Sequence, residues 1–156
     1  MLHFIAGDLF FNKPKFTAIA QGVNCRGVWG GGISRPFFTR WPEMLQLYLA
    51  KCKSDIPDNL GGQCLFYDDR KISGYFVCNL FTQIDPGPDA RYNLIEQCLA
   101  ETKHTLDKEG IDSLGLPAIG AGIGGLQLEK VKDIVRLVFN NWAGNVYFYQ
   151  EYRVNS

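Results

Sequence analysis

Two hydrophobic patterns alternate along this chain. Short apolar runs bounded by glycine or polar residues predict strands, whereas apolar residues that recur every three or four positions predict amphipathic helices. The predicted strands span residues 2–5, 17–23, 62–67, 75–81, 113–119 and 145–149, and the predicted helices span residues 33–53, 91–109 and 128–142. The polar segment 68–74 is expected to form a turn between two of the strands.

Two predicted helices carry an apolar face, and the third is interrupted. The inward faces consist of Ile95, Cys98, Leu99, Thr102 and Leu106 in one helix, and of Leu128, Val131, Val135, Val138 and Trp142 in the other. Gly110 follows the first of these helices as a stop signal. In the segment 33–53, Pro36 and Pro42 each lack a backbone N–H, so we expect the helix to break at both.

Strands that alternate with helices indicate an α/β fold with a mixed, largely parallel sheet covered on both faces. The 156 residues, 46% of them hydrophobic, are enough for one domain with its own core, so residues 1–156 are interpreted as a single domain. Ligands of such folds bind beyond the C-terminal ends of the strands.

Two glycine-rich segments stand at such strand ends. The first contains Gly30, Gly31 and Gly32, and the second runs from Gly120 to Gly125. Glycine is retained where the backbone turns tightly or approaches a ligand closely. Each segment follows a predicted strand and precedes a helical pattern, an arrangement that presents backbone N–H groups to phosphate. We therefore expect a ligand with two phosphates, or one diphosphate bound from both sides.

Two other phosphate-binding interpretations fit poorly. Gly120, Gly122 and Gly125 match G-x-G-x-x-G, but a dinucleotide fold needs an acidic residue about 20 positions later at the end of the next strand. Glu151 lies beyond the final predicted strand, and too little chain remains for a second half of that fold. No Gly-Lys-Ser/Thr follows either segment, which excludes a Walker P-loop.

Charge and cysteine content narrow the classes of function further. The net charge is zero, the pI is about 6.7 and there is no basic run, so we expect no broad nucleic-acid surface. The five cysteines lack C-x-x-C spacing and are interpreted as free thiols, and with only two histidines no metal site is expected. Without a signal pattern or a long apolar stretch, we expect a cytoplasmic monomer that does not contact membranes.

Several motifs, in their order along the chain, resemble the macrodomain, an ADP-ribose-binding α/β/α module. They lie at residues 7–10, 21–24, 30–33 and 116–126. The sequence Asn-Cys-Arg-Gly-Val-Trp-Gly-Gly-Gly-Ile at 24–33 is most similar to the branch that contains ADP-ribose-1″-phosphate phosphatases. The branch that removes ADP-ribose from glutamate or DNA bases is a near relative. The resemblance implies a three-layer α/β/α domain over nearly the whole chain.

The resemblance assigns parts of ADP-ribose to positions of this sequence. Asp8, beside Leu9, stands where macrodomains place a carboxylate that accepts a hydrogen bond from adenine; the alternative is an Asx turn closing the first strand. Asn24 stands at the distal-ribose asparagine; the alternative is a strand-end residue that caps its own backbone. The resemblance places the two phosphates on Gly30, Gly31, Gly32 and Ile33, and on Gly120, Ala121, Gly122, Ile123, Gly124 and Gly125. Ordinary tight turns are the alternative for these glycines.

The sequence also departs from the family pattern. The phosphatase branch has a histidine at the position of Gln21, and glutamine can orient water or a phosphate oxygen but cannot shuttle a proton near neutral pH. The relatives that act on glutamate or DNA bases have a lysine near Thr82–Gln83 and an aspartate near Gly124, and neither is present here. Cys25 is interpreted as a packed thiol rather than a nucleophile.

The remaining candidates lie around these motifs. Asp85, in a Pro/Gly-rich segment after a strand, is a candidate for orienting water or acting as a general base, and Asp89 is interpreted as a solvated charge. Trp29 could cover the distal ribose. Tyr149 or Tyr152 could stack on adenine, although Tyr149 fits equally well as a half-buried strand residue.

Together these features predict a single macrodomain that binds ADP-ribose and hydrolyses an ADP-ribose derivative without a cofactor. Asn24, Gln21 and Asp85 are the catalytic candidates. The favoured reaction removes the 1″-phosphate from ADP-ribose 1″-phosphate. One alternative is hydrolysis of ADP-ribose from a protein acceptor, in which case ADP-ribosylated proteins are partners. The other is a reader module that binds ADP-ribose without turnover, which the missing histidine, lysine and aspartate favour.

Overall fold

A computed structural model describes residues 1–11 and 15–152 as one α/β unit. The strands are β1 (Leu2–Gly7), β2 (Ala18–Asn24), β3 (Cys64–Asp69), β4 (Tyr75–Gln83), β5 (Ser113–Pro117) and β6 (Asn145–Tyr152). The helices are α1 (Ser34–Arg40), α2 (Pro42–Ser54), α3 (Pro57–Leu60), α4 (Tyr92–Lys108) and α5 (Leu128–Val138).

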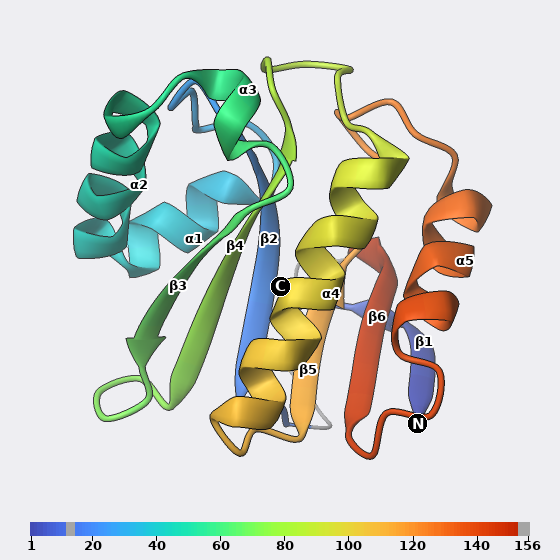
Figure 1. The fold of residues 1–156 in the computed structure, drawn as a ribbon. Coiled ribbons are helices and arrows are strands. Elements are labelled where there is room, and N and C mark those ends of the chain that lie inside the picture. The colour runs from blue at the N-terminus through green and yellow to red at the C-terminus, as the bar shows by residue number, and fades with distance from the viewer. Residues whose placement is uncertain (12–14, 153–156) are drawn as a thin grey trace.

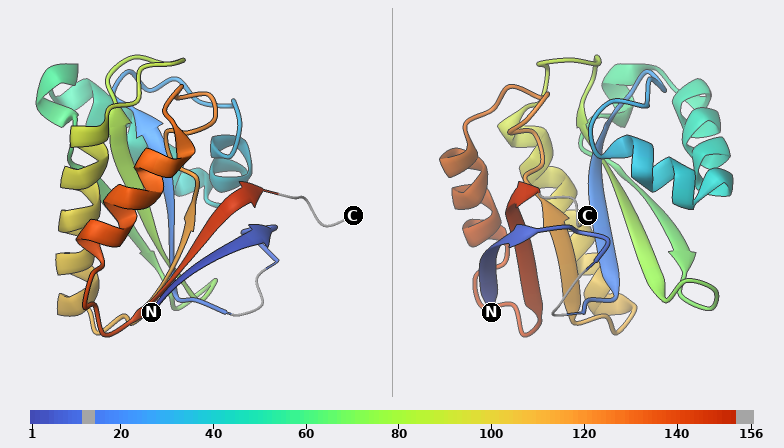
Figure 2. Two further views of the ribbon diagram at one scale, coloured as in Figure 1. Left: turned by 90° about the vertical axis from the view of Figure 1, so that its right-hand side faces the viewer. Right: turned by 180° about the vertical axis from the view of Figure 1, so that it is seen from behind.

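The six strands form one sheet in the order β1-β6-β5-β2-β4-β3, with β3 antiparallel to β4 and every other pair parallel. Helices α4 and α5 cover one face, and α1, α2 and α3 cover the other (Figures 1 and 2). The predicted three-layer α/β/α fold with a mixed, largely parallel sheet is therefore confirmed.

The two faces bury separate apolar cores. Alternate residues of a strand point to opposite faces, so Ala18 and Ala20 of β2 pack with α4 and α5, whereas Ile19 and Val23 pack with α1 and α2. The predicted inward face of α4 is buried in full.

Two helical predictions need correction, and one short helix was not predicted. Pro36 lies in the first turn of α1, where a missing N–H is tolerated, so the chain breaks only at Trp41, before Pro42. Helix α5 ends at Val138 rather than at 142, yet Trp142 stays buried against Phe139, and its indole Nε1–H donates to Asp107 Oδ1 at 2.7 Å. The short helix α3 carried no periodic signal in the sequence.

The sheet topology positions the site. Strand β2 pairs with β4 along its length, but it pairs with β5 only at Ala18–Leu114 and Ile19–Gly115. The two strands therefore diverge toward their C-terminal ends. The chain also leaves β2 toward β4 and leaves β5 toward β6, in opposite directions along the sheet. Such a switch point opens a crevice in α/β sheets.

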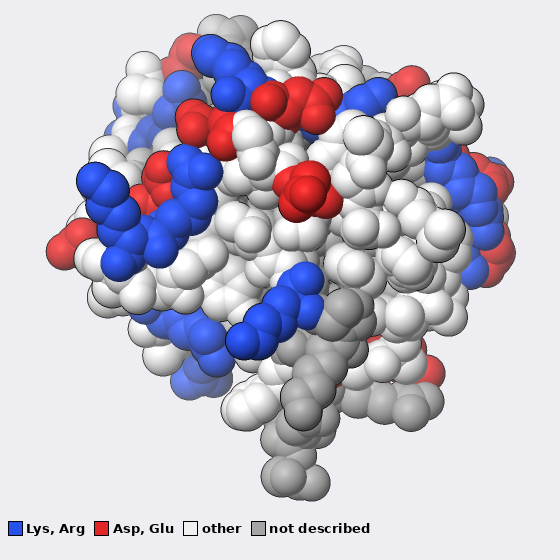
Figure 3. All heavy atoms as spheres, turned by 90° about the horizontal axis from the view of Figure 1, so that it is seen from below, with Lys and Arg blue, Asp and Glu red and all other residues white. Residues whose placement is uncertain are grey.

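Figure 3 shows the face at the strand ends away from this crevice, where basic side chains lie among acidic and uncharged ones. In the part of the chain that the structure describes, no helix is long and apolar enough to cross a membrane. Nor do its His, Cys, Asp and Glu side chains form a cluster suited to a metal ion.

Candidate functional site

A cavity of about 720 Å³ lies at the C-terminal ends of β2, β4 and β5. Both glycine-rich segments line it, so the structure brings together two regions that are far apart in the sequence. The segment that follows β4 supplies a third wall through Gln83, Pro86 and Gly87. The predicted site residues in the wall are Asn24, Trp29, Gly31, Gly32, Ile33, Gly120, Ala121, Gly122, Ile123, Gly124 and Tyr149.

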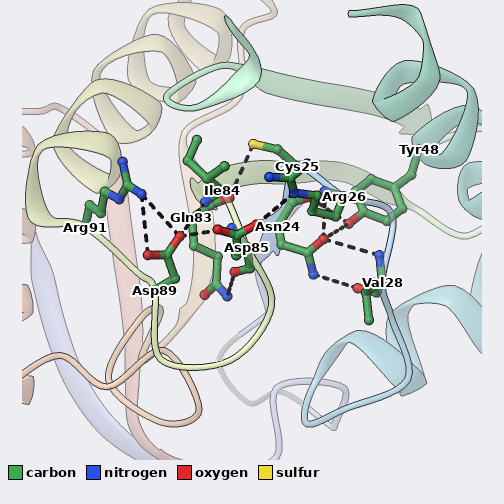
Figure 4. Close-up of polar contacts among 10 residues, drawn as sticks. All are labelled: Asn24, Cys25, Arg26, Val28, Tyr48, Gln83, Ile84, Asp85, Asp89 and Arg91. Carbon is green, nitrogen blue, oxygen red and sulfur yellow. Dashed lines mark hydrogen bonds and ion pairs between the residues drawn. The ribbon is translucent and has the colours of Figure 1, made fainter. Parts of the chain in front are cut away.

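Asn24, at the end of β2, is buried and organises the loop that follows it (Figure 4). Its Oδ1 accepts hydrogen bonds from the backbone N–H groups of Arg26 at 3.0 Å and Val28 at 3.2 Å, and its Nδ2 donates to Val28 O at 2.7 Å. The Tyr48 hydroxyl donates to the Asn24 backbone carbonyl at 2.7 Å. The side chain therefore caps its own loop, as the alternative interpretation had it, and one amide N–H remains for another acceptor.

The first glycine segment presents unused backbone donors. Ser34 Oγ accepts from Gly30 N at 3.2 Å and donates to Gly31 O at 2.8 Å, so the Gly30 donor is already satisfied. The N–H groups of Gly31, Gly32 and Ile33 bond to no acceptor in the described part of the chain. Positive φ angles of 106° at Gly30 and 54° at Gly32 make this turn possible.

The second glycine segment also presents unused backbone donors. Leu126 N donates to Gly120 O at 2.8 Å and Gly125 N donates to Gly122 O at 3.2 Å, which closes the loop on itself. The N–H groups of residues 122–124 bond to no acceptor among the residues that the structure describes. Each loop thus offers three consecutive donors at the cavity, as an anion-binding site requires.

The glycines of the second loop differ in how closely they pack against neighbouring residues. A Cβ at Gly124 would lie 2.7 Å from Ala90 Cβ, and one at Gly125 would lie 3.0 Å from Pro88 Cβ, so both allow close packing against the segment after β4. Gly125 does not line the cavity, and neither does Gly30. A Cβ at Gly122 would meet nothing within 4 Å, and neither Gly122 nor Gly31 has a positive φ.

The two loops touch each other through an exposed isoleucine. Ile123 Cδ1 lies 3.2 Å from the position that a Cβ would take at Gly32 and 3.6 Å from that position at Gly31. Trp29, 43% exposed, packs edge-on against Phe38 with ring centroids 5.7 Å apart. Ile123 and Trp29 therefore make this part of the cavity rim apolar.

Gln21 lies within β2, outside the cavity wall. Its side chain is fully buried and does not line the cavity, and its Nε2 donates to Asn79 Oδ1 at 2.7 Å, next to it on β4. Asn79 Nδ2 donates in turn to Leu65 O at 3.0 Å, while Gln21 Oε1 has no hydrogen-bond partner in the described part of the chain. The structure thus places Gln21 in a polar ladder between strands and does not bring it to Asn24.

Asp8 and Leu9 also lie outside the cavity wall. Asp8 is buried, and its Oδ1 accepts from Phe10 N at 2.9 Å in an Asx turn. It lines a second cavity of about 960 Å³, and Tyr149 lines both cavities. Burial, followed by the charges of Tyr75 and Asp8, raises the pKa of Tyr149 to about 12. Leu9 is fully buried in the core beside α1 and α2.

Asp85 is half-exposed and lies beyond the wall, in an ion pair with Arg26 (Figure 4). Arg26 Nε donates to Asp85 Oδ1 at 2.7 Å, and this hydrogen bond raises the pKa of Arg26. Asp89, interpreted from the sequence as a solvated charge, accepts from the backbone N–H groups of Ile84 and Asp85. The hydrogen bond from Asp85 N lowers the pKa of Asp89 most.

Cys25 is a packed thiol. Its Sγ donates to Gln83 O at 3.3 Å, and burial raises its pKa to about 12. Gln83 Nε2 donates to Asp85 O at 2.7 Å and to Gly87 O at 2.9 Å, which shapes the third wall. Sequence reasoning missed the part played by Gln83, although its position at the end of a strand beside β2 was a usable signal.

Among the residues that the structure describes, those that line the cavity include no charged side chain. Their polar groups are backbone amides and the side chains of Asn24, Trp29, Ser34, Thr82, Gln83, Tyr149 and Gln150. Such a site can bind an anion through neutral donors, orient a sugar hydroxyl and exclude water. It has no side chain in the wall that titrates near neutral pH.

Comparisons with known proteins agree with this geometry. The Macro domain family matches residues 20–135. An ADP-ribose 1″-phosphate phosphatase from Debaryomyces hansenii is 29% identical, over 94% of this chain and 98% of its own length. A DNA ADP-ribosyl glycohydrolase from Mycobacterium tuberculosis is 29% identical over 85% of this chain, but over only 37% of that protein. The solved macrodomain of Thermus aquaticus DarG has a TM-score of 0.82 at 25% identity and covers 96% of this chain and 97% of its own.

Proposed function

This chain belongs to the Macro domain family, and from that premise we propose that it binds ADP-ribose and removes the 1″-phosphate from ADP-ribose 1″-phosphate. One observation carries the proposal: two runs of three backbone N–H groups, at residues 31–33 and 122–124, have no acceptor among the described residues and border the same 720 Å³ cavity. Charge-assisted hydrogen bonds from backbone amides suit a diphosphate. The phosphatase relative, which this chain matches along nearly its full length, supports the reaction.

The remaining groups fit the two ends of the ligand. The free N–H of Asn24 Nδ2 would donate to the distal ribose, and Trp29 would cover that sugar. Tyr149, between the two cavities, and Asp8, in the second one, lie together at what we propose to be the adenine end.

The uncharged wall determines the kind of catalysis we propose. Water attacks the phosphorus of the 1″-phosphate and the bond from phosphorus to the ribose oxygen breaks. A proton of that water passes to the ribose oxygen, so that ADP-ribose and inorganic phosphate leave. The rate would come from positioning and from fixed backbone dipoles in a site shielded from water, without a covalent intermediate. All five cysteines are free thiols, which supports a cytoplasmic location, and we propose a monomer.

A reader module that binds without turnover is the second candidate. The same uncharged wall favours it, together with the burial of Gln21 outside that wall, at the position where the phosphatase branch has a histidine. Both candidates require ADP-ribose binding, so only turnover separates them.

Phosphate release from ADP-ribose 1″-phosphate, beside calorimetry with ADP-ribose, tests the proposal. We expect multiple turnovers on this substrate and none on p-nitrophenyl phosphate, which lacks the groups that the two loops would bind. Tight binding of ADP-ribose without phosphate release would refute the phosphatase proposal and support the reader module. Absence of binding would refute both.

A further inference from the structure

One ion pair connects two walls of the cavity. Arg26 lies in the loop between Asn24 and Val28, both of which line the cavity, and Asp85 lies between Gln83 and Pro86, which also line it. Arg26 Nε and Asp85 Oδ1 are 2.7 Å apart, and the two side chains are 50% and 55% exposed. The pair therefore lies at the edge of the cavity, beside Asn24 (Figure 4).

The base of the Arg26 side chain is fixed, whereas its tip is available. The Arg26 backbone N–H donates to Asn24 Oδ1 at 3.0 Å, and the preceding residue donates from Cys25 N to Ile84 O at 3.0 Å. Only the Nε of the guanidinium is used by Asp85. Within the described residues, the two terminal NH₂ groups have no acceptor, so four donors of the planar fork remain for an anion.

Replacing Asp85 by a phosphate group as the partner of the Arg26 guanidinium costs little free energy and favours phosphate. Exposed ion pairs contribute little to stability because water and salt screen them. A phosphate group carries more negative charge than a single carboxylate, and it matches the two-pronged geometry of a guanidinium. The wall itself offers no charged group to a phosphate attached to the distal ribose.

We propose that Arg26 forms a subsite for an anionic group on the distal ribose. Its terminal NH₂ groups bind a phosphate at that sugar, and Asp85 is the counter-ion that holds the guanidinium at the cavity edge when no phosphate is there. Arg26 then makes the protein prefer ADP-ribose that carries a 1″-phosphate over ADP-ribose itself. This rests on the proposed binding of the distal ribose at Asn24, but it does not require turnover.

Calorimetry with two ligands tests the subsite without relying on activity. The ligands are ADP-ribose and its 1″-methylenephosphonate analogue, which cannot be hydrolysed. We expect the parent to bind the phosphonate more tightly by at least tenfold. Arg26→Ala should lose on the order of 10–100-fold in phosphonate affinity, the range of a charge-assisted hydrogen bond, with ADP-ribose affinity changed less than about twofold.

Two further variants separate a specific contact from charge alone. Arg26→Lys keeps the charge but not the fork, so it should keep only part of the preference. Arg35→Ala is the matched control, because Arg35 follows the cavity residue Ser34 and is exposed; it should keep the parental ratio of the two affinities. Asp85→Asn removes the competing carboxylate and should preserve or increase phosphonate affinity.

The outcomes are distinguishable. An unchanged affinity ratio in Arg26→Ala, or an equal fall in Arg35→Ala, would overturn the subsite. Equal affinity of the parent for both ligands would overturn it as well, without touching ADP-ribose binding. A preference that depends on Arg26 in a protein that releases no phosphate would support the subsite and refute the phosphatase. A parent that binds neither ligand would refute both proposals.

Discussion

Gly122→Glu is the sharpest perturbation of the second glycine loop. A Cβ at Gly122 meets nothing within 4 Å, and its φ is not positive, so the backbone accepts a side chain without strain. Substitution of glycine at such a position can even stabilise a protein, by about 0.4–1 kcal/mol, because the unfolded chain loses freedom. We therefore expect a folded variant whose Tm lies within a few degrees of that of the parent.

The effect on binding should be large for electrostatic reasons. A carboxylate about 6 Å from a phosphate repels each negative charge by about 3 kcal/mol at an effective dielectric constant of about 20. One such charge corresponds to roughly a hundredfold loss of affinity, and a diphosphate brings two. The Gly122 N–H, which bonds to no acceptor in the described chain, lies where this repulsion would act.

Calorimetry with ADP-ribose on the parent, Gly122→Glu and Gly122→Gln measures this effect. Glutamine has nearly the size of glutamate but no charge, so it should lose far less affinity. If folded Gly122→Glu binds ADP-ribose within about threefold of the parent, the diphosphate does not lie against this loop. If glutamine and glutamate weaken binding equally, the reason is steric.

Three further outcomes follow from other parts of the site. Gly120→Ala should lower Tm by several degrees, because a Cβ at φ +77° would lie 2.9 Å from Ile95 Cδ1; an unchanged Tm in thermal unfolding would contradict this. Asn24→Ala should reduce kcat by about 10–100-fold and lower Tm, because the loop N–H groups of Arg26 and Val28 lose their acceptor; parental kinetics and Tm would show that the amide organises nothing. Burial raises the pKa of Cys25 from 9.0 to about 12, so the stability that this thiol contributes is present below pH 9 and is lost as pH rises toward 12. Denaturant unfolding should therefore give a stability–pH slope that is shallower in Cys25→Ala than in the parent, by up to about 1.4 kcal/mol per pH unit, and equal slopes would refute the shift.

The sequence contains enough information for the fold and for the position of the site. Buried apolar runs alternating with helices predict a parallel sheet, and parallel strands bring their C-terminal ends to one edge. Both glycine segments follow such ends, so their convergence was predictable. The continuity of α1 through Pro36 was not predictable, because a proline is tolerated within the first turn of a helix and the sequence alone does not set where that turn begins.

Single polar residues were harder to place than loops. The chemistry of Gln21 suggested a role beside Asn24, but the Gln21 amide donates to Asn79 on the neighbouring strand β4. The pairing of β2 with β4 is a tertiary feature that the local pattern does not give. The ion pair of Asp85 was not predictable, because Arg26 lies 59 positions away, and neither was the separate cavity that Asp8 lines. Such pairings depend on tertiary packing rather than on local pattern.

The central claim is that two separated loops hold the diphosphate of a single ADP-ribose molecule. Titration calorimetry of the parent with ADP-ribose and with AMP, under the same buffer and salt, tests it most directly. We expect one site for ADP-ribose and an affinity for AMP lower by at least about tenfold, because AMP offers one phosphate and no distal ribose to the loops at residues 31–33 and 122–124. Equal affinities for the two ligands would contradict the account.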